Sequence, residues 1–527
     1  MTSLDRSPTL HRHRLKNINF PWTAFVVYTI VFSVYGISRV NTYLANGYDL
    51  GIFDQVVQHY AHFQVPISTL KGDDYNIWGD HFHPIIALWA PLYWIWDNVR
   101  VIIIGQAIVA ASAIFPLWRI TRRHMGQGWW AKAFSVAILF GWPIQCLIDF
   151  DVHEIAFAVP LLAWVVDGLD RHADKALLIA CVLLLLVRED MGTLVCIAGF
   201  IRLVWGCQGR RRTPRDWLFS GGLMVGGLAF FVVVTTVVLP HFAPAGYQYW
   251  NYTVLEVHGS GLGAWLVMIG HAIAAIVLPV TKIWTWFVLL VPVGFLCLGS
   301  PYGLLAVPIM AERMLADREH LWSTHFHYNA PVWIIICLAA VDAVDRLPQS
   351  WVGRMAAGAR RVFRSRGTSR EAVHDGLAKL LVGSQVLATL LAATQLVHPI
   401  TDIFPFSRMI TTAAFRTDAS AQARGDAVAW LPANTCVAAD DQIAGQLTHT
   451  NRVTVPGISD HHQDFYVLDL DRVQPATTPA NWSTEFTLDY AHYTLGFSVK
   501  FQSGSVVILE SPDYSGPDPA NCGPAAS

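Results

Sequence analysis

Long apolar segments separated by short polar ones occupy the chain from Phe20 to Val397. An apolar helix needs about 20 residues to cross the hydrocarbon of a bilayer. The pattern predicts about eleven membrane-spanning helices, at 20–40, 101–118, 131–148, 155–169, 174–187, 191–206, 217–239, 263–281, 284–299, 329–345 and 376–397. Two further apolar stretches, 84–96 and 302–311, are too short to cross and are typical of interfacial or re-entrant helices.

After Thr401 the pattern changes to short alternating elements that are typical of an α/β domain. Strands are expected at 435–439, 452–455 and 465–470, helices at 441–447 and 482–493, and a closing hairpin at 496–510. We therefore predict a cytoplasmic N-terminus over 1–19, a transmembrane domain over 20–399 with a first outer loop at 41–100, and a C-terminal α/β domain over 400–510. The Pro-, Gly- and Ala-rich segment 511–527 is expected to be a mobile tail.

Composition supports a membrane location. Hydrophobic residues make up 54% of the chain and charged residues only 14%, against roughly 25% in soluble domains. The mean hydropathy is +0.39. A net charge of −2 gives no overall basic field, which argues against nucleic-acid binding.

Basic residues indicate the orientation, because cytoplasmic loops of membrane proteins are enriched in Lys and Arg. With the N-terminus inside, every second loop holds a basic cluster; these clusters include Arg119–Arg123, Arg210–Arg215, Lys282 and Arg346–Arg370. This predicts a multi-pass plasma-membrane protein whose C-terminal domain is extracytoplasmic. Cys436 and Cys522, the two cysteines of that domain, could then form a disulfide or remain thiols.

Acids and histidines gather in the predicted outer segments. They are Asp49, Asp54, Asp80, His81 and His83 in the first loop, Asp149, Asp151, His153 and Glu154 in the second, Glu189 in the third, and Arg313, Arg318, His325 and His327 before the tenth span. Any single one could simply cap a helix or face water. Four such segments on one side favour a shared cavity, since ionisable groups at the membrane boundary tend to mark functional sites.

Three classes of function fit these residue types: an enzyme, a transporter or channel, and a scaffold. For an enzyme, a carboxylate can act as a general base toward a hydroxyl, paired acids with His can hold Mg²⁺ or Mn²⁺, and Arg can bind phosphate. Together they are typical of group transfer from a lipid phosphate carrier. The same residues could form an ion pathway in a transporter or channel, or belong to a non-catalytic scaffold for envelope assembly. No internal repeat is visible, and the charges lie at outer helix ends rather than at the membrane midplane, which favours an enzyme.

The motifs resemble a known family. YDLGIFDQ, GDHFHPIIALWAPLYWIW and LWRITRRHMG, followed by DFDVHEIAFAVPLLAW, LLLLVREDMG, HFHYNAPVW and DFYVLDLD, are similar to the predicted polytopic membrane proteins called domain of unknown function 2079 (DUF2079). This resemblance runs over roughly Phe20 to Leu509. That family in turn resembles the GT-C superfamily of glycosyltransferases, which use polyprenyl-phosphate sugars and carry an acid in the first outer loop.

The GT-C resemblance implies roles for individual residues. Asp49 matches the catalytic acid, and GDHFHP stands where an interfacial helix begins. The double acid common at the first site is absent, because Asp49 is followed by Leu50 and Gly51 and the next acid is Asp54. The implied reaction moves a sugar from a polyprenyl-phosphate carrier to an acceptor hydroxyl, with inversion and with Asp49 as general base.

The same resemblance implies partners for the reacting groups. Leaving phosphate would be neutralised by Arg313 or Arg318, helped by His325 or His327. A Mg²⁺ or Mn²⁺ ion would be held near Asp80, His81, Asp149, Asp151 and Glu154, with Asp54, His83, His153 and Glu189 nearby. No organic cofactor is expected. The acceptor would be an envelope glycan, lipid or protein, and no motif identifies the sugar.

Overall fold

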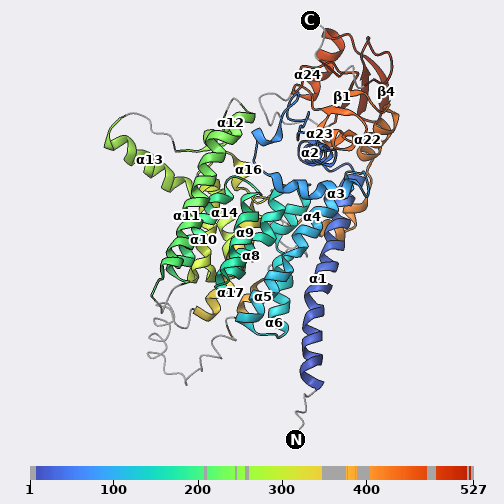
Figure 1. Ribbon diagram of the computed structural model, residues 1–527. Helices are drawn as coiled ribbons and strands as arrows, with labels where there is room; N and C mark the ends of the chain where they lie inside the picture. The colour runs from blue at the N-terminus through green and yellow to red at the C-terminus, as the bar shows by residue number, and fades with distance from the viewer. Residues whose placement is uncertain are drawn as a thin grey trace.

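The protein consists of a helical bundle with a small α/β domain at one end (Figure 1). The computed structural model describes residues 8–206, 211–243, 246–255, 260–346, 376, 378–385, 387, 404–471, 482–518, 522 and 523, and for 8–18 and Trp250 it describes the backbone alone. The C-terminal domain lies beside α2 and α3, at the end of the bundle that also carries Asp49. We call this the Asp49 end.

The bundle is built from helices that are mostly joined by short turns. They are α1 (Pro8–Asn41), α4 (Arg100–Ser112), α5 (Ile114–Met125), α6 (Trp129–Leu139), α7 (Trp142–Asp149), α8 (Ala158–Asp170), α9 (Asp174–Leu185), α10 (Met191–Val204), α11 (Pro214–Val233), α12 (Leu239–Phe242), α13 (Leu262–Ala275), α14 (Thr281–Leu290), α15 (Ala306–Met314), α16 (Glu319–Trp322) and α17 (Asn329–Arg346). The first outer segment adds a π-helix, η1 (Gly47–Gly51), with α2 (Ile52–Ala61) and α3 (Ala90–Tyr93). This mostly helical architecture confirms the predicted fold class.

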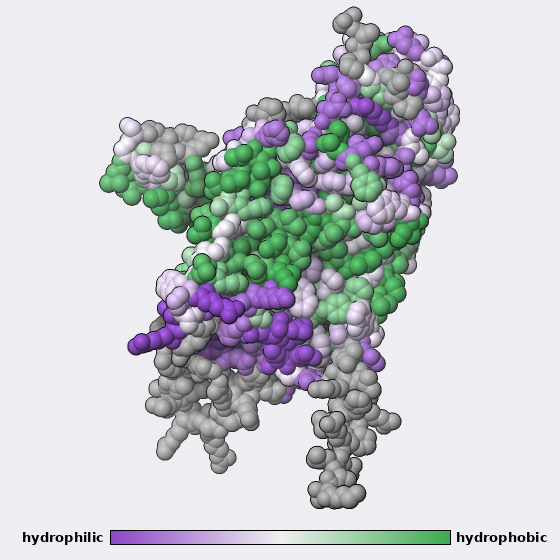
Figure 2. All heavy atoms as spheres, viewed as in Figure 1, coloured by the Kyte–Doolittle hydropathy of each residue, from purple (hydrophilic) through white to green (hydrophobic). Residues whose placement is uncertain are grey.

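On the face shown in Figure 2, hydrophobic residues form a band across the bundle, with hydrophilic residues above and below it. Within the described residues, four helical stretches are long and apolar enough to cross a membrane, namely Asn19–Asn41, Arg100–Met125, Trp129–Asp149 and Pro214–Phe242. Shorter apolar helices lie at Pro84–Tyr93, Met191–Val204, Leu262–Ala275 and Thr281–Val293. The chain is therefore membrane-embedded, and the count of eleven spans stays a prediction.

One predicted segment differs in extent from the structure, and another lies mostly outside the described residues. The stretch 302–311, expected to be too short to cross, lies within a longer helical segment formed by a 3₁₀ turn (Pro301–Leu305) and α15. The Ser300 hydroxyl before this segment donates to Asp342 near the end of α17. The predicted span 376–397 lies mostly outside the described residues, of which 376, 378–385 and 387 are helical.

Lys282 lies at the Asp49 end rather than among the predicted cytoplasmic basic residues. Its Nζ donates to the carbonyl oxygens of Ala275 at 2.9 Å, Met314 at 2.7 Å and Ala316 at 3.4 Å. Ala316 in turn pairs with Thr253, in the loop that also contacts Asp80. The ammonium group is stabilised there because carbonyl groups at helix C-termini have no partners within the helix and carry partial negative charge. The orientation predicted for this lysine was wrong.

At the opposite end, arginines converge on one buried acid. Asp167 of α8 is fully buried and forms ion pairs with Arg119 at 3.3 Å, Arg123 at 2.7 Å and Arg171 at 2.7 Å. Two of these cations come from α5, so the pairs link the ends of α5 and α8. This end therefore combines a basic surface with internal charge compensation, as the loop pattern predicts.

The C-terminal domain contains one five-stranded sheet in the order β2-β1-β3-β5-β4. Its strands are β1 (Cys436–Ala439), β2 (Arg452–Thr454), β3 (Phe465–Asp469), β4 (Ser498–Ser503) and β5 (Val506–Glu510), and its helices are α21 (Ser407–Ile410), α22 (Ala419–Trp430), α23 (Asp441–Leu447) and α24 (Thr484–Asp489). β1 pairs in parallel with β2 and β3, whereas β5 pairs antiparallel with β3 and β4. The helix α23 follows β1 directly, and the predicted α/β character of this part is confirmed.

A disulfide joins Cys436, at the start of β1, to Cys522 near the C-terminus. Cys522 is 2% exposed, so the expectation of a mobile tail does not hold at this residue. Structural disulfides form in oxidising compartments, and this bond is therefore consistent with a domain outside the cytoplasm.

Candidate active site

Asp49 lies in the π-helix η1, within the predicted first outer loop and shortly after the first helix. Its side chain is 22% exposed, and Oδ1 lies 3.6 Å from Nε2 of His153. Burial and the charges of Asp151 and Asp441 raise the pKa of Asp49 well above the ordinary value, while Lys71 acts in the opposite direction. A carboxylate that is reachable and more basic than usual suits proton abstraction.

His153 belongs to a stack of rings beside Asp49. Its ring lies 3.7 Å from that of His327 and 5.4 Å from that of Phe150. The His153 backbone is held by Gln106 of α4, whose side-chain oxygen accepts from His153 N at 2.8 Å and whose Nε2 donates to Asp151 O at 2.5 Å. Burial lowers the pKa of His153 to about 4, so the imidazole is neutral near pH 7.

Three buried imidazole nitrogens at this site have no hydrogen-bond partner in the part of the chain that the structure describes. They are Nε2 of His153, Nδ1 of His83 and Nδ1 of His327. Burial lowers the pKa of His83 and of His327 as well. Buried polar atoms are normally hydrogen-bonded, so neutral unpaired imidazoles indicate a place for a polar, hydroxyl-bearing ligand.

Asp80 forms a second group with Lys71 and Tyr249. Oδ2 of Asp80 is 3.0 Å from Nζ of Lys71, and Oδ1 accepts from the Tyr249 hydroxyl at 3.1 Å. Burial raises the pKa of Asp80, but Lys71 and His81 outweigh that effect and lower it to about 2. Lys71 also lies 5.1 Å from the centre of the Tyr48 ring, directly beside Asp49 in sequence. Lys71 thus pairs with Asp80 and also acts electrostatically on Asp49.

His81 and Glu189 join the first and third outer segments. Nδ1 of His81 lies 2.7 Å from Oε1 of Glu189, and Glu189 also accepts from Phe82 N at 3.0 Å and from the Tyr247 hydroxyl at 3.1 Å. Burial alone would lower the pKa of His81, but the Glu189 carboxylate raises it to about 9. The His81 ring stacks on Tyr249 at 4.4 Å, and His81 is charged at neutral pH.

Arg188 is the buried cation of the third segment. It binds Asp190 through two nitrogens, each at 2.8 Å, and its Nη1 lies 3.5 Å from Oε1 of Glu154. Glu312 of α15 lies within electrostatic reach of the same guanidinium. Arg188 thus links the second and third outer segments to α15.

Asp149 and Asp151 bind Arg39 of α1. Arg39 lies 2.9 Å from Asp149 and 3.3 Å from Asp151. Asp149 also accepts from the Tyr35 hydroxyl at 2.6 Å, and Asp151 accepts from Asn46 N at 2.8 Å. Burial raises the pKa of Asp151 to about 6 despite the arginine. These acids therefore fix the end of α1 that leads into η1.

Asp54 is fully buried, in contrast to Asp49. Its carboxylate accepts from the Tyr93 hydroxyl at 2.5 Å and from the Thr448 hydroxyl at 2.5 Å, and lies 3.0 Å from His449 Nε2. Thr448 and His449 belong to the C-terminal domain. Asp54 therefore fastens α2 to that domain and does not face a ligand.

The four residues predicted to bind phosphate are separated by the structure. Arg313 is buried and donates to Leu321 O at 2.6 Å and to Asn329 at 2.8 Å, while the other three lie nearer the surface or the ring stack. Arg318 is half-exposed and lies 4.6 Å from the centre of the Tyr252 ring, and His325 is exposed. His327 is neutral and packs on His153. Only Arg318 combines a permanent charge with access from solvent.

The five predicted metal ligands do not form one coordination group. Asp80 pairs with Lys71, His81 with Glu189, Asp149 and Asp151 with Arg39, and Glu154 with Arg188. Each carboxylate already faces a cation, so these residues do not fit a shared divalent ion, and the predicted Mg²⁺ or Mn²⁺ stays a prediction.

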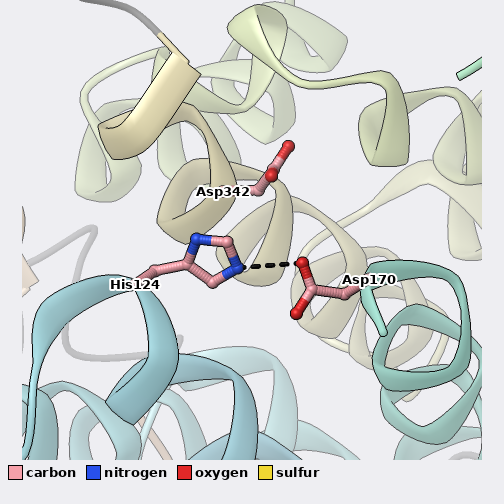
Figure 3. Close-up of side chains that lie close together, drawn as sticks. All are labelled: His124, Asp170 and Asp342. Carbon is pink, nitrogen blue, oxygen red and sulfur yellow. Dashed lines mark hydrogen bonds and ion pairs between the residues drawn. The ribbon is translucent and has the colours of Figure 1, made fainter. Parts of the chain in front are cut away.

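Among the described residues, the group whose donor atoms lie close enough for one ion is at the opposite end of the bundle, and consists of His124, Asp170 and Asp342 (Figure 3). There His124 bridges Asp170 at 3.0 Å and Asp345 at 2.5 Å, and Arg346 contacts Asp342 at 2.5 Å. Internal charge pairing accounts for this cluster.

An apolar groove of about 400 Å³ runs along α15. Its lining includes Trp286, Leu290, Leu304, Val307, Met310 and Met314. The same helix carries Glu312, which lies within electrostatic reach of Arg188. Arg318 lies four residues beyond Met314, after the end of this helix.

Several residues of the site were not singled out from the sequence. Lys71, Tyr247 and Tyr249 are the main ones, and Asp441 contributes from the C-terminal domain. Lys71 and Arg100 are the two Lys or Arg residues of the predicted loop 41–100, and this sparse basic content is a weak signal. The tyrosines are distant in sequence, and only the tertiary structure brings their hydroxyl groups to Asp80 and Glu189.

The fold is GT-C-like, as a comparison with solved structures shows. The solved structure of ArnT from Cupriavidus metallidurans bound to undecaprenyl phosphate is similar, with 14% sequence identity, 94% of this chain and 98% of that chain covered, and a TM-score of 0.50. The apo state of ArnT matches with 13% identity, 95% and 98% coverage, and a TM-score of 0.49. No curated protein matches the chain.

Residues 39–485 match the predicted membrane protein family DUF2079, and the chain belongs to this family. The resemblance drawn from YDLGIFDQ and the later motifs is thereby confirmed, together with the GT-C-like fold.

Proposed function

We propose that the protein is a membrane glycosyltransferase that moves a sugar from a polyprenyl-phosphate carrier to an acceptor hydroxyl. The observation that carries this proposal is the accessible carboxylate of Asp49, 3.6 Å from a neutral histidine and without a Lys or Arg ion pair among the described residues. The other predicted acids are buried or bound to a cation.

In the proposed reaction, Asp49 accepts the proton of the acceptor hydroxyl. The acceptor oxygen attacks the anomeric carbon of the donor, and the bond between that carbon and the phosphate oxygen breaks, with inversion at the carbon. The electron pair leaves with the polyprenyl phosphate. The raised pKa of Asp49 supports this role, because a more basic carboxylate takes up a proton more readily at the operating pH.

The surrounding residues support recognition of such a donor. The unpaired imidazole nitrogens of His83, His153 and His327 suit sugar hydroxyl groups. Arg318, which is half-exposed, and Lys71, which also pairs with Asp80, are the cations proposed for the leaving phosphate. Arg318 follows α15, the helix that lines the apolar groove. A polyprenyl chain in that groove would bring its phosphate to the site. ArnT, which has this fold, was crystallised with undecaprenyl phosphate.

The acceptor is proposed to be an envelope glycan, lipid or protein that reaches the Asp49 end from outside the cell. The disulfide of the C-terminal domain supports that orientation. The proposed reaction uses no metal ion, because the predicted carboxylate ligands are already paired with cations of the protein.

The test is sugar transfer by purified protein in nanodiscs, with a panel of undecaprenyl-phosphate-linked hexoses and pentoses as donors. Asp49→Asn should reduce the rate by at least about 100-fold, as expected for loss of a general base. The control is Asp74→Asn, since Asp74 lies in the same outer loop and is 75% exposed; it should retain the wild-type rate. Full activity of Asp49→Asn would show that Asp49 is not the general base. An ion current through the wild-type protein, without any sugar transfer, would favour a channel.

A further inference from the structure

The C-terminal domain contacts the backbone around Asp49 directly. The helix α23 lies against η1, and Oδ1 of Asp441 accepts a hydrogen bond from Tyr48 N at 2.6 Å. A Cβ added to Gly47 would lie 2.6 Å from the Ala444 Cβ and 3.0 Å from Gly445 N. The two segments therefore meet backbone to backbone, which leaves little freedom for η1.

The hydrogen bond from Tyr48 satisfies a group that η1 cannot satisfy by itself. The first N–H groups of a helix have no acceptor within the helix, and η1 begins at Gly47. Isolated π-helical turns are rare and often occur at functional sites. Asp441 supplies the missing acceptor for the Gly47–Tyr48 peptide, and so restrains the backbone one residue before Asp49.

Other contacts hold the C-terminal domain to both sides of η1. Before it, Gln446 donates to Val40 O at 2.8 Å and Arg424 donates to Tyr43 O at 3.0 Å. After it, Asp54 is bound by Thr448 and His449. The C-terminal domain thus contacts the chain on both sides of Asp49, and its Asp441 acts electrostatically on Asp49.

We propose that Asp441 is a positioning residue for Asp49, so that the C-terminal domain forms part of the active site. This inference rests on the proposed function. Asp441 acts through the hydrogen bond to Tyr48 and through its negative charge. The other titratable groups that face Asp49 are Asp151, His153 and Glu154 from the second outer segment, Lys71 and Tyr48 from the first, and Tyr328 before α17.

The two contributions of Asp441 are separable by two substitutions. Asp441→Asn keeps an oxygen acceptor for Tyr48 and removes the charge. It should leave the rate at high pH within about twofold and move the acidic limb of the pH profile to lower pH, because a negative charge no longer favours protonation of Asp49. Asp441→Ala removes both the acceptor for Tyr48 N–H and the negative charge. It should lower kcat by about tenfold or more, with KM for the donor changed by no more than about twofold.

The matched control is Asp73→Asn. Asp73 also joins the outer loop to the C-terminal domain, through Ser459 at 2.5 Å and Asp460 N at 3.0 Å. It should leave kcat and the pH profile unchanged. An Asp441→Ala protein with wild-type kcat and pH profile, or an equal loss in Asp73→Asn, would overturn the proposal.

Amide hydrogen exchange, measured on a peptide that covers 44–52, tests the contact between Asp441 and Tyr48 independently of catalytic activity. Exchange at Tyr48 should accelerate in Asp441→Ala and stay at the wild-type rate in Asp441→Asn and Asp73→Asn. Unchanged protection in Asp441→Ala would overturn the positioning role. Normal transfer by Asp49→Asn together with lost protection in Asp441→Ala would instead reject the proposed base and keep the contact.

Discussion

His81 offers a pH-dependent test of the charged network at the Asp49 end. Its imidazole lies 2.7 Å from Glu189, is 19% exposed, and has a pKa raised from 6.5 to about 9. A group whose pKa is raised on folding stabilises the folded protein fully below its unfolded pKa. That stabilisation is lost as the pH rises through the folded value. For His81 the window runs from pH 6.5 to about 9.

The size of the effect follows from the pKa difference. At about 1.36 kcal/mol per pKa unit, a change from 6.5 to about 9 corresponds to roughly 3 kcal/mol of unfolding free energy. Stability should therefore fall by about this amount between pH 6.5 and 9.5 as His81 loses its proton. In His81→Gln the side chain is neutral at every pH, so this part of the dependence should vanish.

Equilibrium unfolding in mixed detergent micelles over pH 6 to 10 measures the effect. His62→Gln is the control, because His62 is exposed and its ring nitrogen Nδ1 lies 2.8 Å from the backbone carbonyl of Gln58, one helix turn earlier. Wild type and this control should show the same fall, and His81→Gln should lie lower at pH 6.5 and converge with them above pH 9. A flat wild-type curve, or an equal fall in His81→Gln, would refute the ion pair.

Two further predictions concern the C-terminal domain. Replacing both Cys436 and Cys522 by Ala opens a loop of 86 residues, and chain entropy predicts a loss of about 4.6 kcal/mol in the unfolding free energy of the domain. Limited proteolysis of the domain should therefore be faster than in the wild type. Resistance equal to that of the wild type would contradict this prediction. Gly47→Ala places a methyl group 2.6 Å from Ala444, so transfer should fall, whereas Gly222→Ala, which meets nothing within 4 Å, should behave as wild type.

Patterns along the chain predicted the class of fold and the outer carboxylates, because these depend on local hydrophobicity and on which side each loop lies. The small α/β domain was visible for the same reason, since its strands are short apolar runs bounded by turns. The confirmed family resemblance added a GT-C-like fold and singled out Asp49.

The roles of individual residues depended on distant partners. Asp49 and Asp54 look alike in sequence, yet Asp54 is buried by Thr448 and His449, which lie almost 400 positions further along the chain. Lys282 was placed with the wrong loops because the loop-charge pattern takes no account of helix C-terminal carbonyls. The supposed metal ligands Asp149 and Asp151 are held by Arg39, a residue inside the first predicted span.

The most direct test of the account is a structure of the protein in a lipid nanodisc with undecaprenyl phosphate. The account predicts the phosphate beside Asp49, within hydrogen-bonding distance of Arg318 or Lys71, and the polyprenyl chain in the apolar groove along α15. A lipid phosphate bound at the opposite end, or a continuous water path through the helices with no lipid at Asp49, would contradict it.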